Sequence, residues 1–471
     1  MRKDIRTSCL CSLAILLLAA CGEDRTYEYL AKTETDNWIE DRMQEMYLYY
    51  QDMPQPEMED YFKSPDEFFA SILAPQDKFS YIEMPAETQT RNNIQTVTYG
   101  FDFVLTSDPT GTSSRRTARV LQVLPQSPAA IAGLQRGDYI VQVDGNNVTT
   151  ENSYRLQSGE GVTLTVLPLV DNEEEGYMEW GIDTLMFTLT PAVSLENNPV
   201  YLAKVIEQGG QRIGYLMYNE FKSGPTESDI TYMEQMLQTF QWFKQQNVTD
   251  FILDLRYNQG GQVSCAQLLA ALLAPSGALG QEFAWFEFND KQQSSNYSLL
   301  LPSEYAGYNL NLNRLFIISG LYTASASEMM VNCLRPYMAV HLIGTQTVGK
   351  NVAMTRIESP YEFVMYPVTA TVYNKDGQSD YTEGFAPEYL ITELNYYPWY
   401  ELGDPDELLL KNTLQWIAGG IPSDAENLEQ PEEEGETEEA APAARLRHDA
   451  EPGYSSILKR GFPAAILPDR P

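Results

Sequence analysis

Histidine is scarce in this chain, and its scarcity limits the kinds of catalysis that the protein can perform. There are two histidines among 471 residues. His448 lies in an acidic, low-complexity tail, and His341 begins a short apolar run, HLIG. A hydrolase of the Ser-His-Asp kind needs a histidine as its general base, so the sequence disfavours that chemistry. A serine that is activated by a lysine needs no histidine.

Cysteine is also sparse, with five residues in the chain. Cys9, Cys11 and Cys21 fall near the N-terminus, which leaves Cys265 and Cys333 in apolar, helix-like stretches. Two buried thiols are the default interpretation. An exported protein would also permit a disulfide between them, and the sequence leaves that open. With so few histidines and cysteines, we expect no metal site, and no cofactor.

Basic residues are outnumbered by acidic ones, 31 against 66, and the formal net charge is -35. Part of this excess lies in residues 421–471, which hold 12 acidic and 5 basic residues. Nucleic acid binds to clustered lysine and arginine, so we expect no nucleic-acid partner. Docking on anionic lipid is disfavoured for the same reason. We interpret the charge as a solvated surface that keeps an exported protein soluble.

The N-terminus has the pattern of an export signal over residues 1–21. Three basic residues precede the apolar stretch Leu10–Ala20, which is too short to span a bilayer as a stable helix. Residues 18–22 read LAACG and resemble the lipoprotein box of bacteria. The resemblance implies lipidation of Cys21 and a protein anchored to the outer membrane, facing either the periplasm or the cell surface. The alternative is an ordinary signal peptide with a chance cysteine.

Two segments of the chain, one near each end, show no motif that indicates chemistry. Residues 22–93 predict a helical region. Its first helix opens at residues 36–39 and has Met43, Met46, Tyr47 and Tyr50 on one face, and a second helix starts at Ser64-Pro65. We expect it to serve packing or a homodimer contact. Residues 421–471 are rich in Glu, Pro and Ala and predict an acidic, disordered tail.

Residues 94–192 resemble a PDZ domain. The supporting segments are VTYGFDF at 97–103, a strand at 119–124, a short helix at 127–134 and a strand with an Asp-Gly turn at 136–145. A PDZ domain captures an extended C-terminal peptide by strand addition. The resemblance implies that Tyr99, Gly100 and Phe101 form the substrate-binding loop. The helix beside the groove is short here, with only residues 151–156 available.

Residues 193–420 predict a large α/β domain. Strands that are apolar on both faces alternate with helical stretches, which is typical of a sheet covered by helices on both sides. We expect strands at 213–218, 251–255 and 315–318 and helices near 262–274, 325–337 and 405–418.

Ser325 and Lys350 carry the most informative chemistry in this domain. Ser325 follows a buried strand and a turn and opens a helix, where free amides and a positive field can stabilise an oxyanion. Its spacing to Glu328 fits a helix-capping box equally well. Lys350 has apolar neighbours, and burial would lower its pKa so that it acts as a base. The alternative is an exposed loop lysine.

A third segment, DLRYNQGG at 254–261, is a strand that runs into a double glycine. The absence of side chains at Gly260 and Gly261 lets backbone amides approach a substrate carbonyl closely. The alternative is an ordinary turn between a strand and a helix.

Together, DLRYNQGG at 254–261, SASE at 325–328 and GK at 349–350 resemble the C-terminal processing peptidases, also called tail-specific proteases. The resemblance covers residues 94–415 and implies a crotonase-like (ClpP/crotonase-type) α/β fold. It implies a Ser/Lys dyad in which Ser325 attacks the peptide carbonyl and Lys350 takes the proton.

The same resemblance implies an oxyanion hole made by the amides of Ala326, Gly260 and Gly261. Ser327 is the rival nucleophile, and the family register selects Ser325. Many members carry a glutamine four residues after the lysine, whereas this chain has Met354.

Two further patterns suggest other chemistry and fail on closer reading. Residues 344–350, GTQTVGK, match a phosphate-binding loop, but Asn351 stands where a Ser or Thr should hold magnesium, and the following residues read as a strand. We therefore expect no nucleotide. The Ser456–Lys459 segment has the Ser-x-x-Lys spacing of penicillin-interacting enzymes, and its position in the tail favours chance.

The sequence thus predicts an exported, lipid-anchored serine endopeptidase of the cell envelope. Its expected substrates are unfolded or C-terminal segments of exported proteins. The alternative hypothesis is an inactive or weakly active homologue that binds peptides through its PDZ domain.

Overall fold

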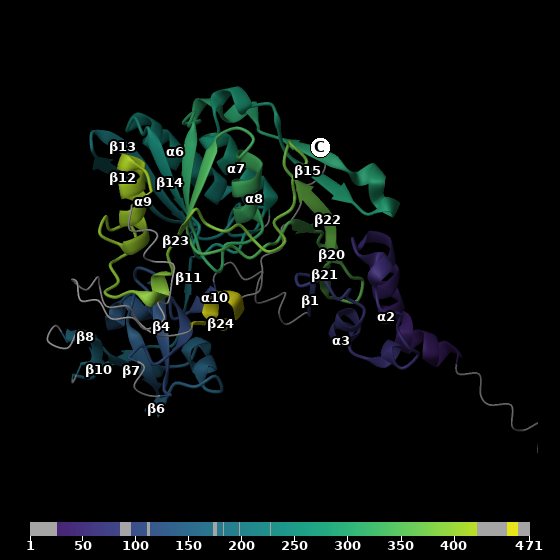
Figure 1. Cartoon of the computed structure of the whole chain (residues 1–471). Coiled ribbons are helices and arrows are strands. Elements are labelled where there is room, and N and C mark those ends of the chain that lie inside the picture. The colour runs from purple at the N-terminus through teal and green to yellow at the C-terminus, as the bar shows by residue number, and fades with distance from the viewer. Residues whose placement is uncertain are drawn as a thin grey trace, which may run out of the picture.

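The computed structural model describes residues 26–84, 96–110, 114–172, 177–181, 183–196, 198–226, 228–421 and 450–459. The predicted export signal and Cys21 lie outside these residues. Within the described ranges, no helix combines the length and the apolar character needed to cross a membrane. Figure 1 shows a large α/β domain, a smaller β domain below it and a group of N-terminal helices at one side.

The large domain is built on a six-stranded sheet in the order β12-β13-β14-β17-β18-β23. Strands β13 to β23 run parallel, and β12 pairs antiparallel with β13. The bounds are β12 Val200–Gln208, β13 Gln211–Tyr218, β14 Asp250–Asp254, β17 Arg314–Ser319, β18 Ala339–Gly344 and β23 Tyr389–Leu390.

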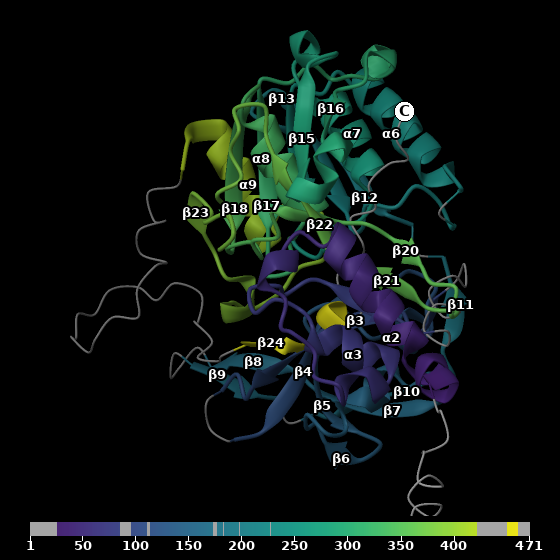
Figure 2. The ribbon, with the colours of Figure 1, turned by 90° about the vertical axis from the view of Figure 1, so that its right-hand side faces the viewer.

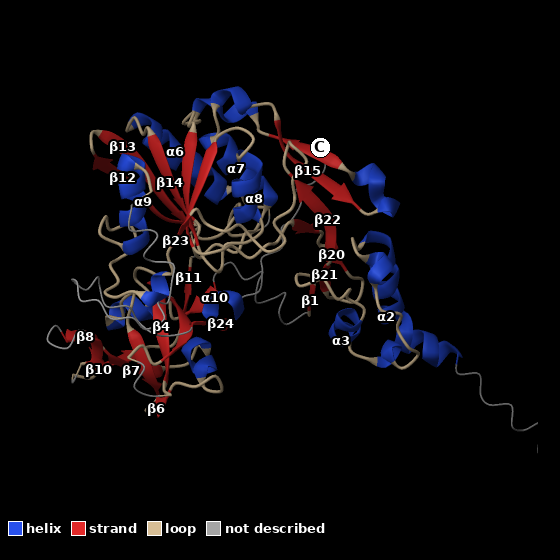
Figure 3. Cartoon of the chain, viewed as in Figure 1, coloured by secondary structure: helices blue, strands red, loops and turns tan. Residues whose placement is uncertain are grey.

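Successive residues of the central strands enter different cores, because side chains alternate across a sheet. Leu253 and Ile317 pack on the side of three helices, whereas Ile252 and Phe316 pack on the side of one. Figure 3 shows the resulting helix–sheet–helix layers. The helices are α6 Thr231–Gln245, α7 Val263–Leu273 and α8 Ala326–Leu334 on the first side, and α9 Leu408–Gly419 on the second.

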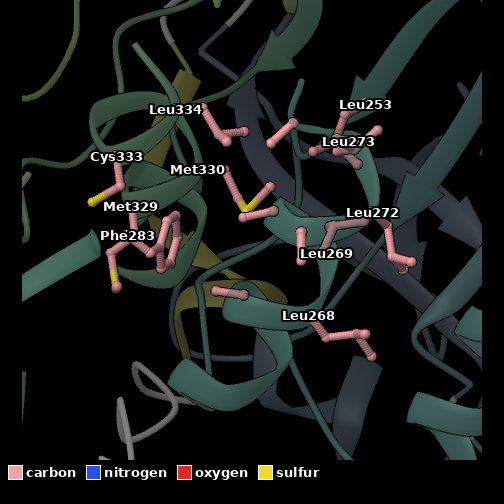
Figure 4. Packing of buried hydrophobic residues seen from close by; sticks show 14 of the residues in the cluster. Leu253, Leu268, Leu269, Leu272, Leu273, Phe283, Met329, Met330, Cys333 and Leu334 are labelled. Atoms are coloured by element: carbon pink, nitrogen blue, oxygen red, sulfur yellow. The ribbon is translucent and has the colours of Figure 1, made fainter. Parts of the chain in front are cut away.

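Helices α7 and α8 are apolar around most of their surface because they lie inside the larger core. Leu269 and Leu272 of α7 and Met330 of α8 belong to one core, and Figure 4 shows them among its buried side chains. Each of these three side chains is at most 2% exposed. The helix that begins after Ser325 is therefore anchored by packing along its whole length.

The strands and helices predicted for this domain are confirmed, with shifts of a few residues at their ends. The prediction at 325–337 becomes α8 Ala326–Leu334, and the one at 405–418 becomes α9 Leu408–Gly419. The residues after the GTQTVGK segment form a strand, β19 Val352–Met354, and not the helix that a phosphate-binding loop needs.

The small β domain contains the strands predicted for a PDZ domain. Its sheet has the order β10-β7-β5-β4-β3-β24, with β6 paired to β5. A short helix, α5 Pro128–Ala132, is capped by Ser127 and closed by Gly133 at φ 95°. The segment beside the expected groove is a single 3-10 turn, Ser153–Gln157. The strands are β3 Phe101–Ser107, β4 Arg116–Val123, β5 Tyr139–Val143, β6 Asn146–Asn147, β7 Val162–Leu167 and β10 Leu185–Leu189.

The N-terminal region packs on the large domain through an extension of its β structure. Helices α2 Thr26–Met46 and α3 Pro65–Ser71 and strand β1 Tyr81–Glu83 meet β20 Ile357–Glu358 and β21 Val364–Tyr366. Figure 2 shows α2 and α3 beside these strands. Of the predicted positions, Met43 and Tyr47 are fully buried there, whereas Met46 and Tyr50 are half-buried. The capping box at Ser64 is present.

A second sheet connects the N-terminal region to helix α8. It has the order β16-β15-β22-β19, with bounds β15 Glu282–Phe288, β16 Tyr297–Leu300 and β22 Val368–Tyr373. Val352 and Met354 of β19 belong to the core that holds α2 and α3.

The prediction of a disordered tail is wrong for residues 450–459. They form strand β24 Ala450–Ser455 and helix α10 Ser456–Lys459, which lie on the small β domain. Composition misled the prediction, because an open sheet edge can order a segment that has little apolar content of its own. The rest of the predicted disorder, residues 422–449 and 460–471, lies outside the described residues.

Candidate active site

Ser325 occupies a constrained turn between β17 and α8. Its backbone has φ 57° and ψ -114°, and such a conformation costs on the order of 1–3 kcal/mol for a residue with a side chain. Neighbouring hydrogen bonds hold it: the Ala324 N–H donates to the carbonyl of Asn258 at 3.2 Å, and the Thr323 hydroxyl donates to the carbonyl of Leu255 at 2.8 Å. The serine turn is thus fastened to the DLRYNQGG segment.

The carboxylate of Glu328 joins the serine turn to the segment that carries Lys350. Glu328 is fully buried. It accepts four hydrogen bonds, from the N–H groups of Ser325 (2.9 Å), Gly349 (2.6 Å) and Lys350 (2.8 Å) and from the hydroxyl of Thr347 (2.6 Å). Burial raises the pKa of Glu328, and these donors oppose the rise. The predicted capping box is present, and the same carboxylate also fixes the lysine segment.

Lys350 is buried, with 1% of its surface exposed. Burial lowers the pKa of the Lys350 ammonium to about 7, although the charges of Glu328 and Asp77 act in the opposite direction. The alternative of an exposed loop lysine is therefore wrong. An amine with this pKa is neutral, and so available as a base, in about half of the molecules at pH 7.

The surroundings of the lysine come partly from the N-terminal region, which the sequence did not indicate. Its Nζ lies 3.8 Å from the sulfur of Met354 and 5.4 Å from the ring centre of Phe79. The Asp77 carboxylate accepts from the hydroxyl of Tyr47 at 2.6 Å and from the N–H of Phe79 at 2.8 Å. The turn after α3 thus holds both a ring and a charge near Lys350.

The double glycine lies directly against the serine. A Cβ added at Gly260, where φ is 105°, would stand 2.8 Å from the Cβ of Ser325 and 3.0 Å from the nitrogen of Ala326. A Cβ at Gly261, where φ is 133°, would collide with the backbone of Phe221. Both positions therefore require glycine, and the structure brings Gly260, Ser325 and Ala326 together.

The hydrogen bonds around these glycines differ from one to the other. The Gly260 N–H donates to the side-chain oxygen of Asn258 at 2.8 Å. A parallel bridge between Phe221 and Gly261 uses the Gly260 carbonyl and the Gln262 N–H, so it does not use the N–H of Gly261.

Ser327 and His341 have other contacts. The Ser327 hydroxyl donates to the carbonyl of Asn258 at 3.0 Å, inside the first turn of α8. His341 lies 2.9 Å from Glu388 and packs beside Trp416 of α9, on the opposite side of the sheet from α8. The hydroxyl of Ser327 is thus bonded to the same carbonyl that accepts from Ala324, and His341 lies away from Ser325.

The remaining predicted residues lie in two other places. Tyr99, Gly100 and Phe101 precede or begin β3, where the ring of Tyr99 is buried in the small domain and the Gly100 N–H donates to Thr98. Cys265 and Cys333 are two free, buried thiols. Burial raises the pKa of Cys265 to about 12, which makes it a poor nucleophile.

Metal binding finds no support in the described part of the chain, where no group of three or more His, Cys, Asp or Glu residues is placed to hold an ion.

The fold and the site place this protein in the class of PDZ-containing peptidases. Three family descriptions match the chain: Peptidase family S41 over residues 212–391, Peptidase S41 N-terminal domain over 34–81 and PDZ domain over 119–167. A crystal structure described as an S41 protease from Bacteroides fragilis NCTC 9343 is 34% identical, with a TM-score of 0.72, and the match covers 81% of this chain and 97% of that one.

The chain therefore belongs to peptidase family S41. It is also 28% identical over 247 residues to the carboxyl-terminal-processing protease of Picosynechococcus sp. and 23% identical over 308 residues to that of Synechocystis sp.. These matches cover 51% and 64% of this chain and 52% and 65% of the two relatives. The chain thus spans between about half and two thirds of the length of these curated relatives.

The sequence did not indicate two features of the site. The spacing of Glu328 indicates only a capping residue. Its second role, which is to hold the lysine segment, depends on the path of residues 347–350. The contribution of Asp77 and Phe79 had no local signal, because neither belongs to a motif. A half-buried Asp-x-Phe turn after a short helix indicates nothing by itself.

Proposed function

We propose that this protein is a serine endopeptidase of the C-terminal processing kind, with Ser325 as the nucleophile and Lys350 as the general base. The observation that carries the proposal is the burial of Lys350, which brings its pKa to about 7, on a segment that Glu328 ties to the serine turn. A serine hydroxyl needs an adjacent base to become nucleophilic, and this site offers a lysine for that role.

In the first step, the neutral amine of Lys350 takes the proton of the Ser325 hydroxyl while Oγ forms a bond to the scissile carbonyl carbon. The carbonyl oxygen becomes an oxyanion. Collapse of the intermediate breaks the C–N bond, and the Lys350 ammonium returns its proton to the leaving amine. Lys350 then takes a proton from a water molecule as that water attacks the acyl-Ser325 ester. The bond to Ser325 Oγ breaks, and Lys350 returns the proton to this oxygen.

The amides of Ala326 and Gly261 are the proposed oxyanion donors. Ala326 is the first residue of α8, and the N–H of a first helical residue has no partner within its helix. The bridge to Phe221 leaves the Gly261 N–H unused. Gly260, whose N–H already donates to Asn258, supports the site by leaving room beside Ser325.

Cleavage of an unfolded protein tests the proposal. The chain without its first 21 residues is incubated with casein beside three variants, Ser325→Ala, Lys350→Ala and Ser327→Ala. Loss of either dyad member should lower the rate by at least roughly 10³-fold, whereas Ser327→Ala should stay active. Thermal unfolding checks that each variant is folded.

The opposite result has a clear meaning. Equal, background-level cleavage by all four proteins would leave a peptide-binding role for the PDZ domain, which is the second candidate function. The replacement of the family's glutamine by Met354, whose sulfur is 3.8 Å from the Lys350 amine, favours that alternative. Activity lost with Ser327→Ala but kept with Ser325→Ala would transfer the nucleophile to Ser327.

We further propose that the protein is exported, anchored to the outer membrane through lipid on Cys21, and acts on unfolded or C-terminal segments of exported proteins. The signal pattern over residues 1–21 supports the anchor. Mass spectrometry of the mature N-terminus tests it, and Cys21→Ser should move the protein from the membrane fraction to the soluble fraction. The homodimer stays a prediction, which sedimentation of the purified chain would check.

A further inference from the structure

The chain covers an edge of its own PDZ sheet. Strand β3 would be the last strand of that sheet, but β24 pairs with it antiparallel, with Ala450 opposite Thr106 and Ser455 opposite Val104. Figures 1 and 2 show β24 and α10, in yellow, beside the small domain. An uncovered edge strand presents unpaired N–H and C=O groups that accept another extended segment, and here the segment comes from the same chain.

The direction of β24 is the direction that a captured peptide would take. Tyr99, Gly100 and Phe101 form the loop before β3, and a peptide that ends at this loop and pairs antiparallel with β3 must run toward Phe101. Strand β24 runs this way, because Ser455 lies opposite Val104 and Ser456 follows beside Phe103. Residues 450–456 therefore occupy the place of a strand-adding ligand.

A buried carboxylate recognises the hydroxyl of Ser456. The Ser456 Oγ donates to one oxygen of Asp102 at 2.8 Å and accepts the N–H of Phe103 at 3.0 Å. The other oxygen of Asp102 accepts from Gln122 at 2.7 Å, and Gln122 in turn accepts from Asn219 of the large domain at 3.1 Å. Asp102 is 3% exposed, so this position selects a hydroxyl donor over an apolar side chain.

The next residue fills an apolar site between the two domains. Ile457 is 2% exposed and packs in one core with Val104 and Leu121 of the PDZ sheet and with Tyr322. Tyr322 belongs to the turn that leads to Ser325. Ser455, which is also fully buried, approaches the Tyr322 side chain. The tail segment thus contacts both the peptide-binding edge and the turn before the nucleophile.

We propose that the edge of β3 recognises extended peptides in which a serine or threonine is followed by an aliphatic residue, and that Ser456–Ile457 is an internal ligand that competes with them. This inference deepens the proposed peptidase function, on which it rests for its biological meaning. A substrate must displace the tail before it can pair with β3. The tail thus competes with substrate peptides for the edge of β3, and a peptide that binds this edge more tightly displaces it.

Peptide binding to the full chain tests this inference without any cleavage. The probe is a fluorescein-labelled peptide with the sequence of residues 450–459, AEPGYSSILK, and its affinity is measured by anisotropy in a Ser325→Ala background. A Ser456→Asp variant places a second carboxylate against Asp102 and should expel the tail. Ile457→Glu displaces it through the apolar site and serves as an independent variant, and Ser423→Asp adds the same charge elsewhere in the tail as a control.

The expected result is binding to Ser456→Asp and Ile457→Glu that is at least about tenfold tighter than binding to the parent, since a tethered segment competes at a high effective concentration. Ser423→Asp should bind as the parent does. A probe with alanine at the position of Ser456 should bind about tenfold more weakly, because a hydrogen bond to a buried charge is lost.

Equal affinities for all four chains, or an alanine probe that binds as well as the original, would overturn the inference. Should Ser456→Asp fail to fold in thermal unfolding, Ile457→Glu decides the matter. A chain that shows the expected binding but whose Ser325 form never cleaves a peptide would overturn the proposed peptidase function and leave this inference standing.

Discussion

At the scale of a single residue, the surroundings of Lys350 determine whether its amine can act as a base. Burial holds its pKa at about 7, and a general base works only in its neutral form. Activity should therefore be present above that pKa and lost as the pH falls through it. We expect kcat/KM to decrease about tenfold per pH unit below the midpoint and to level off above it, in a profile recorded from pH 5 to 9 on a peptide substrate.

Asp77 tunes this midpoint in a direction that can be worked out. Its negative charge raises the pKa of Lys350, so Asp77→Asn should move the midpoint to lower pH by up to about one unit. The asparagine oxygen can still accept the N–H of Phe79, which keeps the turn in place. Asp376→Asn, at an exposed turn, is the matched control. A flat pH profile in the parent would contradict the role given to Lys350. A midpoint that does not move in Asp77→Asn would contradict the effect of the Asp77 charge on the pKa of Lys350.

Gly260 leaves room for Ser325 because it has no side chain. Gly260→Ala would place a Cβ 2.8 Å from the Cβ of Ser325 at a φ of 105°, which displaces the serine turn. Because a shift of about 1 Å at a reacting group can cost roughly 100-fold in rate, we expect kcat to fall by at least that factor.

The control for this change is Gly277→Ala. An added Cβ at Gly277 meets no atom within 4 Å, so steady-state kinetics should match the parent. Full activity of Gly260→Ala would show that the close approach to Ser325 has no catalytic importance.

At the scale of elements, the N-terminal helices are tied to the catalytic side of the large domain. Phe68 of α3 is fully buried in the core that also holds Val352, Met354 and Met365. The turn carrying Asp77 and Phe79 follows this helix. Loss of packing in α3 therefore reaches the environment of Lys350 through the chain itself.

Phe68→Ala should lower the free energy of unfolding by about 3–5 kcal/mol, since it removes a large side chain from a closed core. Phe62→Ala, at a position that is 52% exposed, should change it by less than about 0.5 kcal/mol. Urea unfolding followed by tryptophan fluorescence measures both. Equal stability of the two variants would mean that α3 packs too loosely to support the site.

At the scale of the whole molecule, a buried ionic network joins the PDZ domain to the peptidase domain. Glu393 accepts from Arg136 of the PDZ domain at 2.7 Å, from Arg256 at 2.9 Å and from the hydroxyl of Tyr257 at 2.7 Å. Arg256 also pairs at 2.8 Å with Glu407, the N-cap residue of α9. Arg256 and Tyr257 belong to the DLRYNQGG segment, so the interface between the domains adjoins the strand end that leads to the double glycine.

This network makes the free energy of unfolding depend on pH. Burial alone would raise the pKa of Glu393, but Arg136 and Arg256 lower it from 4.5 to about 2. A carboxylate with a depressed pKa contributes its full stabilisation above its unfolded value and loses it as the pH falls through the folded value. The stabilisation from Glu393 should thus be complete above pH 4.5 and fade toward pH 2.

Glu393→Gln should be less stable than the parent at pH 7, because two buried arginines lose their shared partner. The difference in melting temperature between the two proteins should narrow as the pH falls from 4.5 toward 2.5. Glu207→Gln breaks only an exposed pair with Arg212 and should match the parent at every pH, within about 0.5 kcal/mol. A difference for Glu393→Gln that is constant with pH would contradict the assigned ionisation.

The sequence by itself determined the elements and the reactive groups. Strands β13, β14 and β17 and helices α7 to α9 follow from local apolar periodicity, and the order of DLRYNQGG, SASE and GK follows from the chain. Such signals are local, because a strand, a helix start or a glycine turn depends on residues that are near in sequence.

Only the tertiary structure decided how those groups behave. It buried Lys350 beneath a turn from the N-terminal region, used Glu328 to hold two separate segments, and brought Gly260 directly against Ser325. It also ordered residues 450–459, which read as disordered from composition, on the free edge of β3. The physical reason is common to all four: desolvation, shared hydrogen bonds and edge pairing arise between residues that are far apart in sequence, and they exist only once the chain has packed.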